Sequence, residues 1–143
     1  MKEFIGEGFG KTVIIELERG EKIIESICER LKALGIKNAV VASVVGSIQK
    51  LVYHRPTELS QSTIDEFITI EEPLEICSLT GTVIDGVAHF HFTAAGPKEV
   101  YGGHLEPGSE TLYLFEVTLA EIKGFELERR LTPENVKKIF KKE

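Results

Sequence analysis

Three of the four histidines in this 143-residue chain lie close together in sequence. His89 and His91 flank Phe90 in a segment that alternates imidazole and aromatic side chains. On a β-strand, side chains two residues apart point to the same face, so His89 and His91 project together while Phe90 and Phe92 point the other way. His104 follows in a glycine-rich segment. Three imidazoles can occupy three corners of a tetrahedral metal site, which leaves the fourth corner for water or a ligand.

The ligand type indicates which metals suit such a site. Neutral imidazoles bind zinc, copper, nickel and iron, and zinc is the commonest metal for three histidines with an open position. We therefore predict that His89, His91 and His104 bind zinc or another divalent transition metal. Two alternatives stay open: the imidazoles bond to carbonyl or carboxylate groups, or they form a cleft that binds an anion when protonated. His54, just before Arg55-Pro56, is interpreted as a separate loop residue.

Three further residues flank the histidine segments and are candidates to orient an imidazole or to contact a ligand. Glu75 can act as a base or hold one imidazole tautomer. Glu99 follows Pro97-Lys98, and its alternative role is that of a solvated carboxylate. Tyr101, beside Gly102, can line a cleft or pack against its neighbours. No catalytic residue is assigned.

The elements that must position these residues follow from hydrophobic periodicity. An apolar stripe at helical spacing predicts one main helix over residues 21–34. Alternating or β-branched runs predict strands at residues 11–18, 38–45, 48–54, 66–70, 74–82, 87–94, 111–119 and 125–130. Asp85-Gly86 predicts a hairpin turn, and Thr132-Pro133 predicts the start of a short C-terminal helix. His104 is expected in a turn-rich loop.

These elements predict an α+β fold. Residues 1–143 are expected to form a single compact domain, with a largely antiparallel β-sheet packed against the main helix. Cys28 and Cys77 form no C-x-x-C pair and are interpreted as small core residues in a reducing compartment. We find no signal peptide and no apolar run of about 20 residues, the length of a membrane span. A cytoplasmic protein is expected.

The charge balance bears on the partners. The formal net charge is −6, whereas a nucleic-acid binder presents a basic surface. The one basic cluster, at the C-terminal end of the chain, is flanked by acidic residues. The composition therefore argues against direct DNA binding.

Several segments together resemble the PPC domain, the "plants and prokaryotes conserved" family, also called DUF296. The resemblance covers nearly the whole chain and depends on their order and spacing: Leu-Glu-Ile-Cys-Ser-Leu-Thr-Gly at 74–81, Asp-Gly at 85–86, His-Phe-His at 89–91 and Gly-Gly-His-Leu at 102–105. It implies a compact α+β domain of the free-standing prokaryotic type that assembles as a homotrimer. It also implies a metal site, usually given as zinc, at His89, His91 and His104.

The plant members of the family carry AT-hook motifs that bind DNA, and this chain departs from them in two ways. It has no Arg-Gly-Arg-Pro element. The plant docking stretch Gly-Arg-Phe-Glu-Ile-Leu corresponds here to residues 72–77, where only Glu75 and Ile76 match. The resemblance therefore does not extend to the plant docking role.

Three functions are consistent with these features. The first, which we favour, is a metal-binding module, regulatory or ligand-binding, in which a small molecule completes the coordination sphere. The second is a metal-dependent enzyme of hydrolase or lyase type that uses a zinc-bound water. The third is a DNA-associated accessory protein related to the plant AT-hook proteins. We favour the first because no proton-transfer pair is apparent beside the histidines.

Overall fold

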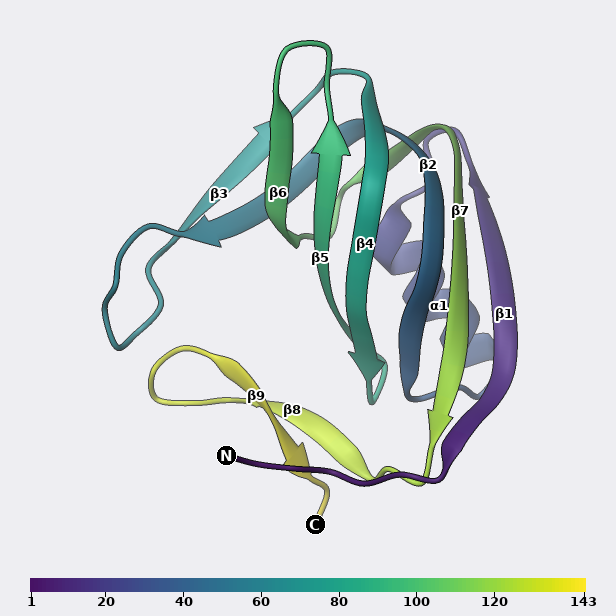
Figure 1. The fold of residues 1–143 in the computed structure, drawn as a ribbon, viewed down its shortest axis with the longest axis vertical. Coiled ribbons are helices and arrows are strands. Elements are labelled where there is room, and N and C mark those ends of the chain that lie inside the picture. Colours follow the sequence, from purple (N-terminus) through teal and green to yellow (C-terminus); the bar gives the residue numbers. More distant parts are fainter.

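All but the last of the predicted strands join into one antiparallel sheet in the computed structural model of this chain, which describes residues 1–143 (Figure 1). The elements are β1 (Gly8–Glu18), α1 (Ile23–Ala33), β2 (Ala39–Pro56), β3 (Asp65–Ile70), β4 (Leu74–Ile84), β5 (Val87–Ala95), β6 (Val100–Leu105), β7 (Glu110–Lys123), β8 (Leu127–Leu131) and β9 (Lys137–Lys141). Seven strands form the main sheet, in the order β1-β7-β2-β4-β5-β6 with β3 paired to β2. Strands β8 and β9 form a separate hairpin.

Strand β2 organises this sheet. It is 18 residues long, and its first part pairs with β7 and β4 whereas its last six residues pair with β3. Its pairing with β7 changes register at three points between Val41 and Lys50, and such irregularities bend a strand. The last part of β2 therefore turns out of the main layer and reaches β6, to which it also pairs. The predicted interruption at Gly46-Ser47 is a break in the pairing and not in the strand.

The hydrophobic core lies between the sheet and α1, but the strands dominate it. The helix is 11 residues long and buries Ile23, Ile27 and Leu31, which lie four residues apart along one face. These three belong to a core cluster of 21 buried residues, and all the others except Ile36 lie on strands. The prediction of a sheet packed against one main helix therefore overstates how much the helix contributes to the core. No helix has both the length and the apolar character that crossing a membrane requires.

The predicted C-terminal helix is wrong. Residues 132–136 form a turn, and β9 then pairs with β8 from Leu131 opposite Lys137 to Leu127 opposite Lys141. Asn135 adopts a left-handed φ of 61°, and Thr132 and Val136 join through a backbone hydrogen bond of 2.9 Å. A short isolated helix rich in lysine is marginal in water, whereas the hairpin satisfies its backbone groups in pairs.

The predicted burial of both cysteines is also inaccurate. Cys28 is partly buried on α1, but Cys77 is exposed. The reason lies in the pairing of β4 with β5, which changes register between Ile76 and Ser78 and so leaves Cys77 at a bulge. Neither cysteine forms a disulfide.

Gly81 provides a test of how tightly β4 supports β5. It has φ of 128°, and a Cβ at this position would lie 2.0 Å from the carbonyl oxygen of His89. We expect Gly81→Ala to lower the free energy of unfolding by about 3 kcal/mol, because both the backbone conformation and the contact are unfavourable. Urea unfolding measures this change.

Gly20→Ala is the matched control. Gly20 also has a positive φ, of 84°, but a Cβ there would meet no atom within 4 Å. This variant should lose only about 1 kcal/mol, from the left-handed conformation alone. Equal losses for the two variants would contradict the close approach of β4 to β5.

Candidate metal centre

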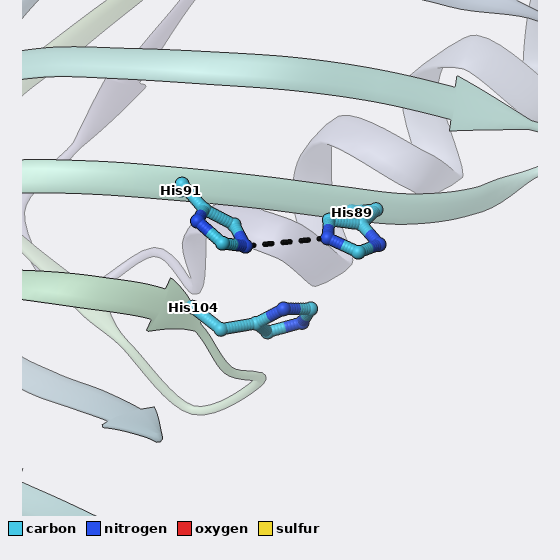
Figure 2. A group of neighbouring side chains, drawn as sticks. All are labelled: His89, His91 and His104. Carbon is cyan, nitrogen blue, oxygen red and sulfur yellow. Dashed lines mark hydrogen bonds between the residues drawn. The ribbon is translucent and has the colours of Figure 1, made fainter. Parts of the chain in front are cut away.

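The four histidines meet on one face of the sheet, although they come from three strands. In the antiparallel ladders His91 of β5 lies opposite His104 of β6, and His104 lies opposite His54 of β2. Directly opposed residues place their side chains on the same face, so these three form a row across the strands. His89 lies two residues before His91 and points the same way. Figure 2 shows His89 and His91 along one strand, with His104 reaching beneath them from the next.

Core packing fixes this orientation. Phe90 is fully buried and Phe92 is 4% exposed, both within the core cluster. Phe92 packs edge-on against Tyr53 of β2, with ring centroids 5.4 Å apart. Because side chains alternate along a strand, burial of the two phenylalanines obliges His89 and His91 to face the other side. Each buried phenylalanine contributes about 2–3 kcal/mol to that choice.

The distances between the imidazoles suit a metal ion. The Nε2 atoms of His89 and His91 lie 3.3 Å apart. Two nitrogen ligands at tetrahedral zinc, each about 2.0–2.1 Å from the ion, are also separated by roughly 3.3 Å. One ligand nitrogen from each of His89, His91 and His104 lies within 4.8 Å of the others. The three residues therefore fit a site for a divalent transition metal.

Electrostatics keeps two of these rings in the form that binds metal. Burial, assisted by the nearby His54, His89, His91 and Arg129, lowers the pKa of His104 to about 3. Burial also lowers the pKa of His89, again with help from Arg129 and the neighbouring imidazoles. Both rings are therefore neutral at pH 7, and only a neutral imidazole offers a nitrogen lone pair to a metal.

A second possible ligand group adjoins the first and shares His104 with it. His54, His104 and Glu106 also bring one ligand atom each within 4.8 Å of the others. The His54 Nδ1–H donates to the Glu106 carboxylate at 2.5 Å, and the His54 ring stacks on His104 with centroids 4.3 Å apart. Glu106 Oε1 lies 3.9 Å from His104 Nε2. Glu106 can therefore orient the imidazoles or bind a cation itself.

The interpretation of His54 as a separate loop residue is wrong. It lies within β2, and the pairing of β2 with β6 joins it to the other histidines. No local pattern signals this contact, since it links residues 50 positions apart. Glu106 was also missed, although the His104-Leu105-Glu106 spacing could have indicated it.

The prediction that His104 lies in a turn-rich loop is wrong. It lies in β6. The glycines before it serve the close approach of strands. A Cβ at Gly103 would lie 2.8 Å from the carbonyl oxygen of His54. Glycine at this position therefore allows β6 to approach β2.

The structure does not bring Glu75, Glu99 or Tyr101 to the histidines. Glu75 is exposed on β4 opposite Ala95, and Glu99 is exposed just before β6. The Tyr101 hydroxyl donates to Glu72 at 2.8 Å, which raises the pKa of Tyr101 to about 12. Its ring packs against the core, three residues from His104 and therefore on the opposite face of β6. None of the three lines the cavity that holds the histidines.

That cavity has a volume of about 860 Å³, which is enough for a small organic ligand. Its walls come from α1, from β2, β5 and β6, and from the β8–β9 hairpin. The four histidines and Glu106 lie on one side, and Arg129 of β8 lines it as well. The site therefore combines candidate metal ligands, a carboxylate and a guanidinium around one cavity.

Comparison with known proteins identifies the fold. The Plants and Prokaryotes Conserved (PCC) domain matches residues 5–123 of this chain. The chain belongs to this family. The resemblance to the PPC domain inferred from the sequence is thereby confirmed, and the β8–β9 hairpin lies beyond the matched residues.

Two solved structures share this architecture. The metal-containing protein AF0104 from Archaeoglobus fulgidus is 29% identical, with a TM-score of 0.78 over 94% of this chain and 95% of that one. A plant- and prokaryote-conserved protein from Pyrococcus horikoshii is 22% identical, with a TM-score of 0.80 over 96% and 95% of the two chains. At 22% identity, the likeness to the Pyrococcus horikoshii protein shows the fold alone.

A curated relative carries a similar segment within a much longer protein. The bifunctional protein GlmU from Synechococcus sp. is 26% identical over 124 residues, which is 86% of this chain but 19% of GlmU. This chain thus covers about a fifth of the length of GlmU.

The low pKa of His104 predicts how stability depends on pH. Between about pH 6.5 and 3, the unfolded chain protonates this histidine and the folded chain does not. Metal-free protein should therefore be most stable above about pH 6.5 and lose stability steadily as the pH falls toward 3. Urea unfolding in the presence of chelator, at a series of pH values, measures this loss.

His104→Gln removes the titrating group and keeps a side chain of similar size. Its stability should fall less steeply than that of the wild type over the same pH range. Parallel curves for the two proteins would show that His104 does not have the lowered pKa.

Proposed function

We propose that this PCC-domain protein binds zinc, or another divalent transition metal, through His89, His91 and His104. The metal then holds a small ligand at its open coordination position, in a binding or regulatory role. One observation carries the proposal: three imidazoles, two of them kept neutral, meet at ligand distances on the wall of a cavity. The relative from Archaeoglobus fulgidus, a metal-containing protein, supports it.

The metal prediction has a direct test. Wild-type protein, untagged and loaded with zinc, should hold close to one ion per chain, measured by elemental mass spectrometry. The double variant His89→Ala/His91→Ala should hold almost none, because it retains one of the three imidazoles. Glu75→Gln, an exposed change on the neighbouring β4, should keep the metal. Equal metal in all three proteins, or none in the wild type, would contradict the site.

A metal-dependent enzyme of hydrolase or lyase type is the second candidate, and the His54–Glu106 pair is the observation that favours it. An ionised carboxylate only accepts hydrogen bonds, so Glu106 holds His54 with its proton on Nδ1. The Nε2 atom of His54 is then free to accept a proton, as a general base must. A bound metal would supply Lewis-acid activation beside this base. Turnover that needs both the metal and His54 would decide for the enzyme.

Two unpaired cysteines suit a reducing compartment, and we propose the cytoplasm. The net charge of −6 argues against direct DNA binding, as the composition predicted.

We further propose that the chain assembles as a homotrimer. The family resemblance implies it, and exposed apolar residues on the outer face of the sheet support it. Ile14 of β1, Val45 of β2 and Leu114 of β7 are 68%, 55% and 40% exposed, respectively. The ladder registers place all three on the face of β1-β7-β2 opposite the one that packs against α1. These exposed apolar side chains share the face with Glu16, Glu18 and Glu116, and such a mixed surface is typical of a contact between chains.

Light scattering tests the trimer. The wild type should have about three times the chain mass of 15.9 kDa. The double variant Ile14→Lys/Val45→Lys should shift toward the monomer, because it replaces two exposed apolar side chains of this face with charged ones. Lys11→Glu, a charge change on an exposed residue of β1, is the control and should leave the mass unchanged. A monomeric wild type at micromolar concentration would contradict the proposal.

A further inference from the structure

Arg129 is a charged residue without a charged partner. Its Nη2 donates to the Thr82 hydroxyl at 3.1 Å, and its Nε is buried without any hydrogen-bond partner. No carboxylate lies within salt-bridge distance of it, although the chain has 23 acidic residues. The next residue, Arg130, pairs with both Glu128 and Glu143. Burying a charge without a partner is costly, so Arg129 has donors available for a group that the chain does not supply.

The guanidinium lies beside the candidate metal centre. Thr82, which anchors it, is the direct cross-strand partner of His89 and so shares a face with it. The positive charge of Arg129 contributes to the lowered pKa of both His89 and His104. Arg129 and the three histidines line the same cavity.

The other charged groups of the cavity leave this donor set free. Arg55 pairs with Glu66, and Glu106 is held by His54. Asp65 and Lys137 line the cavity at the β3 and β9 ends. A guanidinium is a planar fork that matches two oxygens of a carboxylate or phosphate. Thr82 engages one of its five N–H groups, so the fork can still bind such a group.

We propose that Arg129 recognises the anionic group of the ligand, which is a small organic carboxylate or phosphate that reaches from the three histidines to the guanidinium. The inference deepens the proposed function and rests on it for the metal end of the ligand only. The residue that selects the anion lies on the β8–β9 hairpin, outside the residues that the family domain matches.

The test compares Arg129→Gln with Arg130→Gln in the full chain loaded with zinc. Arg130 neighbours Arg129 on β8 but does not line the cavity, so it is the matched control. Each protein is titrated with inorganic phosphate and with succinate, by calorimetry and by thermal shift. The wild type should bind at least one of these two anions, and Arg130→Gln should bind the same anion with the same affinity. Arg129→Gln should bind that anion on the order of tenfold more weakly, since it loses a charge-assisted pair of hydrogen bonds.

The two anions also distinguish the ligand class. Tighter binding of phosphate would assign a phosphorylated ligand, and tighter binding of succinate a carboxylic acid. Arg129→Lys should bind with intermediate affinity, because it keeps the charge but loses the fork. Equal affinity of wild type and Arg129→Gln for both anions, or no binding by the wild type at millimolar concentration, would overturn the inference.

A structural role for Arg129 predicts a different result. If the bond to Thr82 served only to hold the hairpin, Arg129→Gln would unfold at a lower urea concentration and keep its anion affinity. We expect the reverse: an unchanged urea midpoint without anion, and loss of affinity.

Metal content, measured on the same samples, separates this inference from the proposed function. Arg129→Gln should hold as much zinc as the wild type. If the wild type holds no zinc, the proposed metal site fails. Arg129-dependent binding of phosphate or succinate to the metal-free protein would then still support the inference, and its absence would overturn it.

Discussion

The short pairing between the end of β2 and β6 is the contact on which the site depends. Only two residue pairs form it, Tyr53 with Leu105 and His54 with His104. Yet it joins the far edge of the sheet to its central strand, and β2 can reach that edge only because bulges bend it. Tyr53 and Leu105 are both buried in the core, so hydrophobic packing secures the pair that carries the two histidines. One side of this junction is core, and the other is the candidate metal centre.

The site places groups together that repel one another when charged. Four imidazoles lie within one cluster, and Arg129 adds a fixed positive charge nearby. Burial, with help from the neighbouring positive groups, therefore lowers the pKa of His89 and of His104. These two rings have lone pairs available at neutral pH, as a metal ligand requires. The only carboxylate in direct contact, Glu106, is engaged with His54.

Different segments of the chain supply different parts of the site. The residues matched by the PCC domain supply the sheet, the helix, the four histidines and Glu106. The β8–β9 hairpin that follows adds a further wall to the cavity and carries Arg129. The candidate metal ligands and the guanidinium thus come from different segments of the chain. The cavity between them, of about 860 Å³, has the size of a small-molecule site.

The sequence by itself determined the main helix, the shared face of His89 and His91, and the strands other than β6 and β9, because hydrophobic periodicity is a local property of the chain. Its motifs also determined the family. It misplaced His54 and His104, which seemed to belong to loops, and predicted a helix where β9 forms. Only the tertiary structure decided these points. The opposition of His54 and His104, the pairing of His54 with Glu106 and the approach of Arg129 to Thr82 all depend on strand register between distant segments. That register is set by core packing and bulges over the whole sheet, so no short stretch of sequence encodes it.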